Sequence, residues 1–304
     1  MLDVSLLGTG GMMPLPKRHV TSLLLRYNGA SVLIDCGEGT QIALRKKGWS
    51  FKPIEAIFLT HFHADHIAGL PGFLLTMGNA GKTDPLTIIG PKGTVRIVAA
   101  VRTLAPELPF EVKAREIEGN EEIFNIAGLT ITAFRVYHTI PCYAYKVELS
   151  RGGRFDPVRA REAGIPLKFW NPLQKGQICE EDGKVYTPDM VLGAARKGLK
   201  LVYATDTRPV PVIAEMAAGA DLFICEGMYG EPGMDEKARQ NRHMTMQEGA
   251  ELAKKAQPEM LWFTHYSPSL MRPEQYMDEI REIFPRALAA RDGQETTLKF
   301  DEDE

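Results

Sequence analysis

Short apolar runs recur along this chain, and their spacing predicts a layered α/β protein. Runs of strand length, apolar or alternating, occur at 4–7, 22–27, 31–35, 56–59, 86–90, 111–117, 129–137, 201–205 and 260–264. Segments of helical length and pattern lie between some of them, at 67–77, 246–256 and 273–284. Strands that alternate with helices predict sheets with helices on their outer faces. The expected fold class is therefore α/β.

Two local signals sharpen this outline. Asn28-Gly29 joins the runs 22–27 and 31–35, and this dipeptide favours a type I′ hairpin because both central residues of that turn need a positive φ. Thr245-Met246-Gln247-Glu248 has the Thr-x-x-Glu pattern of a capping box, in which the two end residues bond each other's backbone. We expect it to open a helix that continues to Ala256.

Composition favours one large domain over residues 1–304, with an insertion at 150–199. A chain of 304 residues with 44% hydrophobic residues can bury a sizeable core. The four cysteines show no Cys-x-x-Cys spacing, so we expect free thiols and a cytoplasmic protein. We expect no signal segment and no membrane span, because the chain has no apolar run of about 18 residues.

The densest chemistry lies at residues 60–66, Thr-His-Phe-His-Ala-Asp-His, directly after an apolar run. Three of the seven histidines of the chain fall in this segment. Residues two apart in an extended segment point to one side, so His61 and His63 can hold one metal ion. If a helix follows, Asp65 and His66 can face a second ion. Imidazole and carboxylate suit zinc, whereas the alternative is a histidine-rich surface turn.

Three further candidate ligands follow one positional rule. His138, Asp206 and His265 each come just after the end of a short apolar strand. Open α/β sheets build their sites at the carboxyl ends of strands. Each residue alone could be an ordinary loop residue, but all three obey the same rule downstream of the histidine-rich segment. We therefore expect these three residues to complete the metal centre.

The whole pattern resembles a known family. The order His-x-His-x-Asp-His, a lone His, a lone Asp and a late His resembles the metallo-β-lactamase-type hydrolases. The string Asp35-Cys36-Gly37-Glu38-Gly39-Thr40-Gln41 matches, without a change, a string of the ribonuclease Z family, the tRNA 3′-processing endonucleases. Other strings similar to that family are Gly8–Gly11, Pro14–Ser22, Thr60–Gly72, Asp206–Arg208 and Thr264–Ser267.

The resemblance implies the αββα sandwich, in which two sheets are faced by helices, with two zinc ions at one edge. It implies a hydrolase, a zinc-dependent endoribonuclease that removes the 3′ trailer from precursor tRNA and leaves a 3′-hydroxyl. The expected partner is precursor tRNA rather than DNA or a membrane. The resemblance also implies a homodimer.

Roles for individual residues follow from the resemblance and from two-metal chemistry at phosphorus. The first ion is expected on His61, His63 and His138, the second on Asp65, His66 and His265, with Asp206 as the bridge. Asp65 is also the expected catalytic base. His243, oriented by Glu226, is the candidate donor of a proton to the leaving 3′ oxygen, the alternative being an ordinary surface histidine. Loop 14–22 is expected to meet the RNA 3′ end.

Some departures from the family leave the substrate open. The usual Glu-Ala-Thr-Phe is Glu226-Gly227-Met228-Tyr229 here, the usual early Asn is His19, and 164–176 lacks a Pro-Gly-Pro cluster. The alternative function is hydrolysis of a small phosphodiester, ester or thioester, but such relatives lack a basic arm. A redox di-iron variant carries Glu in place of His63. A metal-free binding module would not need seven ligand candidates.

Residues 150–199 stand apart, because they are rich in Gly and Pro and weakly periodic. Residues 151–200 hold ten basic and six acidic residues, a charge of +4; the whole chain carries −3, so the remainder carries −7. Long loops in compact domains are functional or disordered. In ribonuclease Z an arm in this interval, between the lone His and the lone Asp, grips RNA phosphates. The alternative is a solvated insertion without a partner, as we expect for the acidic tail 301–304.

Overall fold

The computed structural model describes residues 1–301 and divides the chain into two compact units. The main unit comprises Met1–Glu148 and Lys200–Lys299. The second unit, called the insert below, comprises Leu149–Leu199 together with Phe300 and Asp301. Beyond Asp301, the acidic tail lies outside the described residues. In the part of the chain that the structure describes, no helix is long and apolar enough to cross a membrane.

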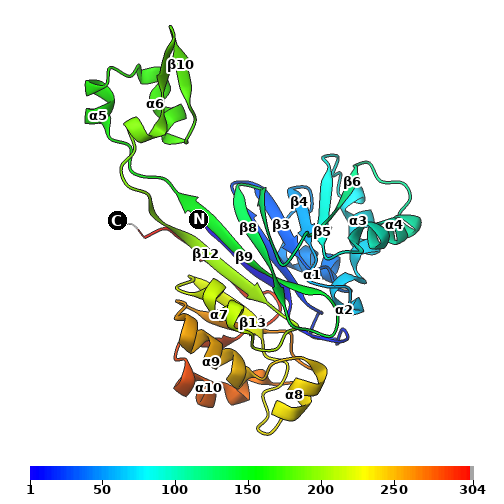
Figure 1. Cartoon of the computed structure of the whole chain (residues 1–304). Helices are drawn as coiled ribbons and strands as arrows, with labels where there is room; N and C mark the ends of the chain where they lie inside the picture. Colours follow the sequence, from blue (N-terminus) through cyan, green and yellow to red (C-terminus); the bar gives the residue numbers. More distant parts are fainter. Residues whose placement is uncertain (302–304) are drawn as a thin grey trace. The chain divides into compact units, whose positions relative to one another are not determined.

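Two seven-stranded sheets form the framework of the main unit (Figure 1). The first has the order β16 (Glu295–Leu298), β1 (Leu2–Gly8), β2 (Ser22–Tyr27), β3 (Ala30–Ile34), β4 (Ile54–Phe58), β5 (Leu86–Gly90), β6 (Val112–Glu116). The second has the order β15 (Ala287–Ala289), β14 (Leu261–Thr264), β13 (Leu222–Glu226), β12 (Arg196–Ala204), β9 (Cys142–Arg151), β8 (Leu129–Val136), β7 (Glu121–Ile126). Strands β3 to β6 pair in parallel, and so do β12 to β15.

Aromatic side chains join the inner faces of the two sheets. Phe58 of β4 lies edge-on to Phe124 of β7 and Tyr145 of β9, with ring centroids 5.5 and 5.3 Å away. The Tyr145 hydroxyl donates to the carbonyl oxygen of Leu59 at 2.5 Å, which satisfies the one polar atom of this buried ring. The sheets therefore pack face to face, with buried aromatic side chains between them.

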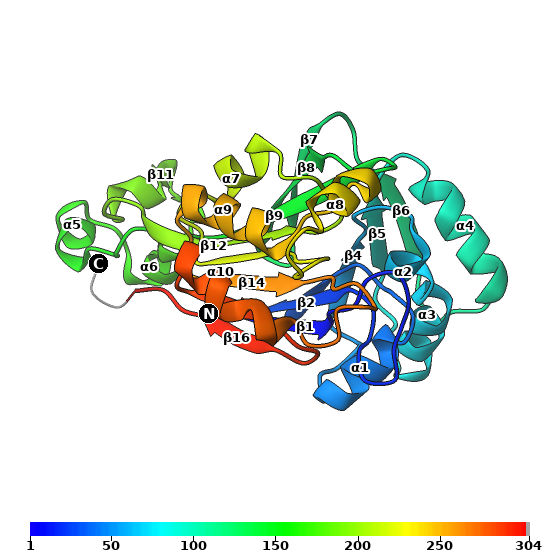
Figure 2. The same cartoon turned by 90° about the horizontal axis from the view of Figure 1, so that it is seen from below.

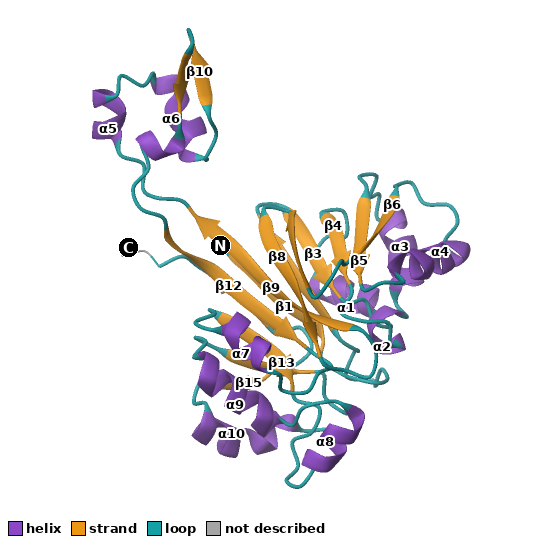
Figure 3. Ribbon diagram, viewed as in Figure 1, coloured by secondary structure: helices purple, strands orange, loops and turns teal. Residues whose placement is uncertain are grey.

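Helices cover the outer faces of both sheets (Figures 2 and 3). Those that follow strands of the first sheet are α1 (Thr40–Lys47), α2 (Ala64–Ile67), α3 (Leu70–Asn79) and α4 (Thr94–Leu104). Those of the second sheet are α7 (Pro211–Ala217), α8 (Asp235–Asn241), α9 (Met246–Ala256), the 3₁₀ turn η2 (Pro273–Tyr276) and α10 (Met277–Ile283). Each outer layer has its own buried apolar cluster. The expected αββα sandwich is confirmed.

The structure confirms both local predictions, the hairpin turn and the capping box. Asn28 and Gly29 have φ of 47° and 85°, so the hairpin between β2 and β3 uses the left-handed turn that the dipeptide favours. At the start of α9, Thr245 Oγ1 accepts from the Glu248 backbone N–H at 3.2 Å, and Glu248 Oε2 accepts from the Thr245 N–H at 3.1 Å. This capping box opens a helix that ends at Ala256, as expected.

The single helix expected at 67–77 is wrong. The chain instead forms the short α2, which ends at Ile67, and a separate α3 from Leu70. Between them Gly69 passes so close to Gly37 that a Cβ at position 69 would lie 2.0 Å from the Gly37 carbonyl oxygen. The Gly69 N–H also donates to the Cys36 carbonyl at 3.0 Å. This tertiary contact breaks the helix, and a sequence pattern cannot show it. The segment 273–284 is likewise divided, into η2 and α10.

The insert is not the structureless loop that its weak periodicity suggested. It contains α5 (Pro157–Glu162), α6 (Leu167–Gln174), the strands β10 (Cys179–Glu181) and β11 (Lys184–Tyr186), and the 3₁₀ turn η1 (Pro188–Met190). Its own buried apolar cluster consists of Ala160, Ile165, Leu173, Tyr186 and Val191. Because these five side chains are scattered over about thirty positions and several short elements, no helical or strand period reveals them.

Candidate metal centre

All seven candidate ligands meet at one edge of the sandwich. The connection after β4 carries His61 and His63, α2 carries Asp65 and His66, and the connections after β8, β12 and β14 carry the rest. The ligand atoms form two groups, each within 4.8 Å: His61, His63, His138 and Asp206 in one, and Asp65, His66 and His265 in the other. The rule that ligands sit at strand ends therefore locates all of them in one place.

The first group has the dimensions of a tetrahedral site. His61 Nε2 lies 2.9 Å from His63 Nδ1, and His138 Nε2 lies 3.2 Å from that same atom. Asp206 Oδ2 lies 3.6 Å from His61 Nε2 and 3.8 Å from His138 Nε2. Tetrahedral zinc with ligands at 2.0–2.1 Å needs roughly 3.3–3.4 Å between ligand atoms. The four distances lie on both sides of this value, so the four atoms are spaced to surround one metal ion.

The second group fits a second ion beside the first. Asp65 Oδ2 lies 3.6 Å from His66 Nε2 and 3.4 Å from His265 Nε2, and those two nitrogens are 3.2 Å apart. Asp206 Oδ1 is 3.2 and 3.1 Å from the same nitrogens, yet this buried oxygen makes no hydrogen bond among the described residues. A buried oxygen that lies this close to two nitrogens without a hydrogen bond is suited to binding a cation together with them. The two oxygens of Asp206 face the two groups, which is the arrangement of a bridging carboxylate.

Strained backbone holds the two central ligands. Asp206 and His265 have φ of 54° and 55°, in the left-handed region that residues with a Cβ rarely adopt. Each such residue costs about 1–3 kcal/mol and persists only where the surroundings enforce it. Both residues follow buried parallel strands, β12 and β14, whose packing supplies that enforcement.

Asp35 is not among the residues predicted from the sequence. It is not itself a candidate ligand, but it orients the ring of one, His66. Its Oδ2 accepts from His66 Nδ1 at 2.7 Å, and its Oδ1 accepts from the Thr60 N–H at 2.8 Å. Such a bond fixes the tautomer that leaves Nε2 free for a metal. Asp35 follows β3, is fully buried and has a left-handed φ of 60°. The strand-end rule applied to Asp35 would have found it.

Burial favours the neutral, metal-binding form of three ligand imidazoles. It lowers the pKa of these three below the ordinary histidine value, namely His61, His63 and His138. At His66 burial acts to lower the pKa, but the carboxylates of Asp206 and Asp35 outweigh it and raise the pKa well above the ordinary histidine value. Burial acts to raise the pKa of Asp206, but the imidazoles of His265 and His66 outweigh it and hold that pKa well below the ordinary value. The neutral imidazoles and the ionised carboxylate are the forms that bind cations.

His243 and Glu226 form a buried pair beside the ligands. His243 Nδ1 lies 2.9 Å from Glu226 Oε2, and Glu226 Oε1 accepts from the Thr207 N–H at 2.6 Å. Burial acts to lower the pKa of His243, but the Glu226 carboxylate outweighs it and raises the pKa to about 9. The His243 ring stacks on that of His265, with centroids 5.5 Å apart. The structure thus brings both predicted residues to the ligand cluster.

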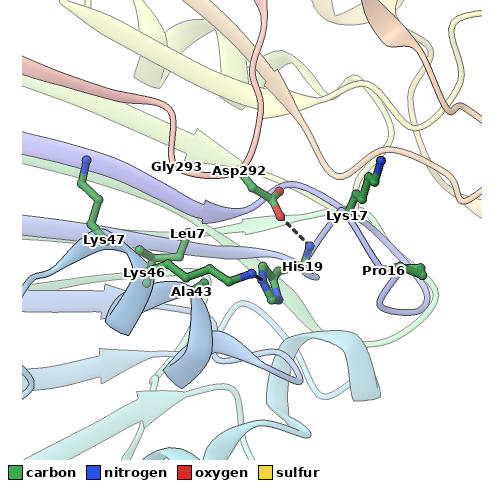
Figure 4. A pocket seen from close by; sticks show the side chains of 9 residues that line it. All are labelled: Leu7, Pro16, Lys17, His19, Ala43, Lys46, Lys47, Asp292 and Gly293. Carbon is green, nitrogen blue, oxygen red and sulfur yellow. Dashed lines mark hydrogen bonds between the residues drawn. The ribbon is translucent and has the colours of Figure 1, made fainter.

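The pocket over the ligands is separate from a pocket that loop 14–22 lines. The pocket over the ligands, about 540 Å³, is lined by Met12, Tyr229 and His243 among others. A second pocket, about 400 Å³, is lined by Lys17, His19 and Lys46, and shares no lining residue with the first (Figure 4). There the Asp292 carboxylate accepts from the His19 N–H at 2.6 Å. Contact of loop 14–22 with RNA stays a prediction.

The fold and the two ligand groups place the chain among proteins of the metallo-β-lactamase fold. Human tRNase Z, short form, matches with a TM-score of 0.69 at 24% identity, over 98% of this chain and 100% of that one. The metallo-β-lactamase fold protein YhfI from Bacillus subtilis matches with a TM-score of 0.68 at 18% identity, over 97% of this chain and 98% of that one.

Sequence comparison then gives the family. A protein named Ribonuclease Z from Agathobacter rectalis is 58% identical over 303 residues, which cover 100% of both chains. A family model described as anti-Pycsar protein Apyc1 matches residues 2–150. The chain belongs to the ribonuclease Z family, and the expected class of enzyme, a metal-dependent endoribonuclease, is thereby confirmed.

Proposed function

We propose that this protein removes the 3′ trailer from precursor tRNA by hydrolysis at a centre of two zinc ions, leaving a 3′-hydroxyl on the tRNA. The single observation that carries the proposal is the bridging position of Asp206, whose two oxygens face two complete ligand groups. Two such ions would generate a hydroxide at neutral pH and offset charge on the phosphate. Full-length similarity to proteins named Ribonuclease Z supports RNA as the substrate.

Two residues of the chain, Asp65 and His243, carry out the proton transfers of the reaction. Asp65 accepts the proton of the attacking water as well as serving as a ligand. Burial acts to raise the pKa of Asp65, but the imidazoles of His265 and His66 lower it, so the carboxylate stays ionised. The Met12 N–H donates to its Oδ2 at 2.6 Å and fixes its orientation.

His243 donates a proton to the leaving 3′ oxygen. Its raised pKa keeps the imidazolium form present at neutral pH, and Glu226 holds Nδ1 so that Nε2 is the donor. Efficient general acids have a pKa near the working pH. A 3′ alkoxide is a poor leaving group, so this proton matters more for RNA than for an activated ester.

The insert contributes binding rather than chemistry. Residues 151–200, which make up nearly all of the insert, carry a charge of +4 against −7 for the rest of the chain, and phosphates attract such a segment in a salt-dependent way. Two further proposals are a homodimer, which rests on family membership, and a cytoplasmic location, which rests on the four free cysteines. Sedimentation of the purified protein tests the first, and fluorescence microscopy of a tagged protein tests the second.

The decisive experiment compares substrates. The zinc-loaded protein is incubated with a 3′-extended precursor tRNA, with DNA of the same sequence and with bis(p-nitrophenyl) phosphate, and the RNA ends are mapped. We expect cleavage next to the mature 3′ end with a 3′-hydroxyl, and no cleavage of DNA. Hydrolysis of the small diester alone would favour the alternative function.

A further inference from the structure

One arginine, Arg208, holds the backbone of His243 in place. The Arg208 guanidinium donates through Nη1 to the carbonyl oxygen of His243. The backbone N–H of Arg208 donates to the Tyr137 carbonyl at 2.9 Å. Arg208 comes two residues after the bridging Asp206, so one short loop reaches both the ligand group and the proposed proton donor.

Glu248 completes this contact from the other side. The Arg208 guanidinium meets the Glu248 carboxylate with both Nη atoms, Nη1 lying 2.9 Å from Oε2. The two side chains are 14% and 21% exposed, and a planar fork of this kind is specific to arginine. Glu248 is also the third residue of α9, where its carboxylate accepts from the Thr245 N–H. It therefore ties Arg208 to the helix that begins just after His243.

We propose that Arg208 and Glu248 form a clamp that positions His243 for proton donation to the leaving oxygen, an inference that rests on the proposed function. Neither Arg208 nor Glu248 lines the pocket over the ligands, and they reach it only through His243, so both are positioning residues. The His243 backbone is held at its N–H by the Ala238 carbonyl at 2.8 Å and at its carbonyl by Arg208. Glu226 then orients the ring. Without the clamp, the carbonyl side of His243 loses its charged partner and the ring can shift.

Leaving-group chemistry separates positioning from support of the fold. A nucleoside 3′ alkoxide must be protonated as it leaves, whereas p-nitrophenolate leaves without a proton. Displacement of His243 therefore slows cleavage of RNA much more than hydrolysis of bis(p-nitrophenyl) phosphate. Loss of metal or of the fold slows both equally.

Two variants test the clamp without removing its bulk. Arg208→Lys keeps the positive charge but loses the fork, and Glu248→Gln keeps the capping box but loses the carboxylate charge. We expect kcat on precursor tRNA to fall about 10- to 100-fold, the range for outer partners of a site. KM and zinc content should stay near wild-type values. The ratio of kcat on RNA to kcat on the nitrophenyl ester should fall at least about 10-fold.

Three controls make the outcome decisive. Arg286→Lys makes the same change in an exposed Arg286–Glu259 pair away from His243 and should change no ratio. The double clamp variant should be no slower than the slower single variant, because both remove one unit. A dinucleotide, also cleaved with an alkoxide leaving group, is a third substrate. If the wild type cleaves the dinucleotide but not precursor tRNA, the proposed function fails while the clamp is still tested. Equal loss on all substrates, or no loss on alkoxide substrates, would overturn the clamp.

Discussion

The main unit and the insert solve different physical problems with different amounts of core. The main unit buries two large apolar clusters, and the strands that end at one edge bring seven candidate ligands into two groups whose ligand atoms lie within 4.8 Å of one another. The insert buries five apolar side chains and carries an excess of positive charge. Metal chemistry needs fixed geometry, which a large core supplies. Attraction of a polyanion needs only charge on a small ordered element.

The largest loss of activity is expected from a substitution at Asp206, between the two ligand groups. Asp206→Asn removes a negative charge from the bridge between the two ligand groups. Activity should fall more than about 100-fold on both precursor tRNA and bis(p-nitrophenyl) phosphate, beyond the range for outer partners. Zinc content, measured by mass spectrometry, should fall below two ions per chain. Retention of two ions with near-normal turnover would refute the bridging role.

The next effect comes from the residue that orients a ligand. Asp35→Asn keeps the size of the side chain but removes the charged acceptor of His66 Nδ1. We expect a 10- to 100-fold loss in activity or in zinc affinity, measured by kinetics and by competition with a chelator. The loss should again be equal on both substrates. A loss restricted to tRNA would mean that Asp35 does not act through the metal centre.

The pH dependence of tRNA cleavage tests the proton donor. The raised pKa of His243, about 9, means that the imidazolium form is present below that value and is lost as pH rises through it. Bound cations lower this pKa, so the upper limb of the kcat profile should lie at or below pH 9. Glu226→Gln removes the charge that raises the pKa, and the limb should move toward the ordinary histidine value of roughly 6.5. An unmoved limb would assign it to another group.

The smallest effect belongs to the insert. Asp156 caps α5, its Oδ1 accepting from the N–H groups of Val158 and Arg159 at 2.8 and 3.1 Å. Asp156→Ala should cost about 1 kcal/mol of local stability. Hydrogen exchange should speed up at amides of the insert only, with zinc content and hydrolysis of the small diester unchanged. Faster exchange throughout the main unit would mean that the two units do not unfold separately.

The main unit and the insert also differ in how much of their structure could be predicted from the sequence. The strands of the main unit are buried, so they stand out in the sequence as apolar runs. The ends of these runs, together with the chemistry of the residues there, were enough to locate all seven ligand candidates. The break at Gly69 could not be predicted, since it depends on the approach of Gly37, which is distant in sequence. The elements of the insert could not be predicted either, because five buried residues in short elements leave no period. Asp35 also follows an apolar strand, so the strand-end rule could have predicted it.

One deletion tests most directly whether chemistry and RNA binding belong to separate units. Residues 155–195 are replaced by a short Gly-Ser linker, which is feasible because the flanks lie together: Arg196 Nε donates to the Gly152 carbonyl oxygen at 3.0 Å. Steady-state kinetics are then measured on precursor tRNA and on bis(p-nitrophenyl) phosphate. We expect a steep loss on tRNA, mainly through a raised KM, and nearly unchanged hydrolysis of the small diester. Equal loss on both substrates, or unchanged cleavage of tRNA, would contradict the separation.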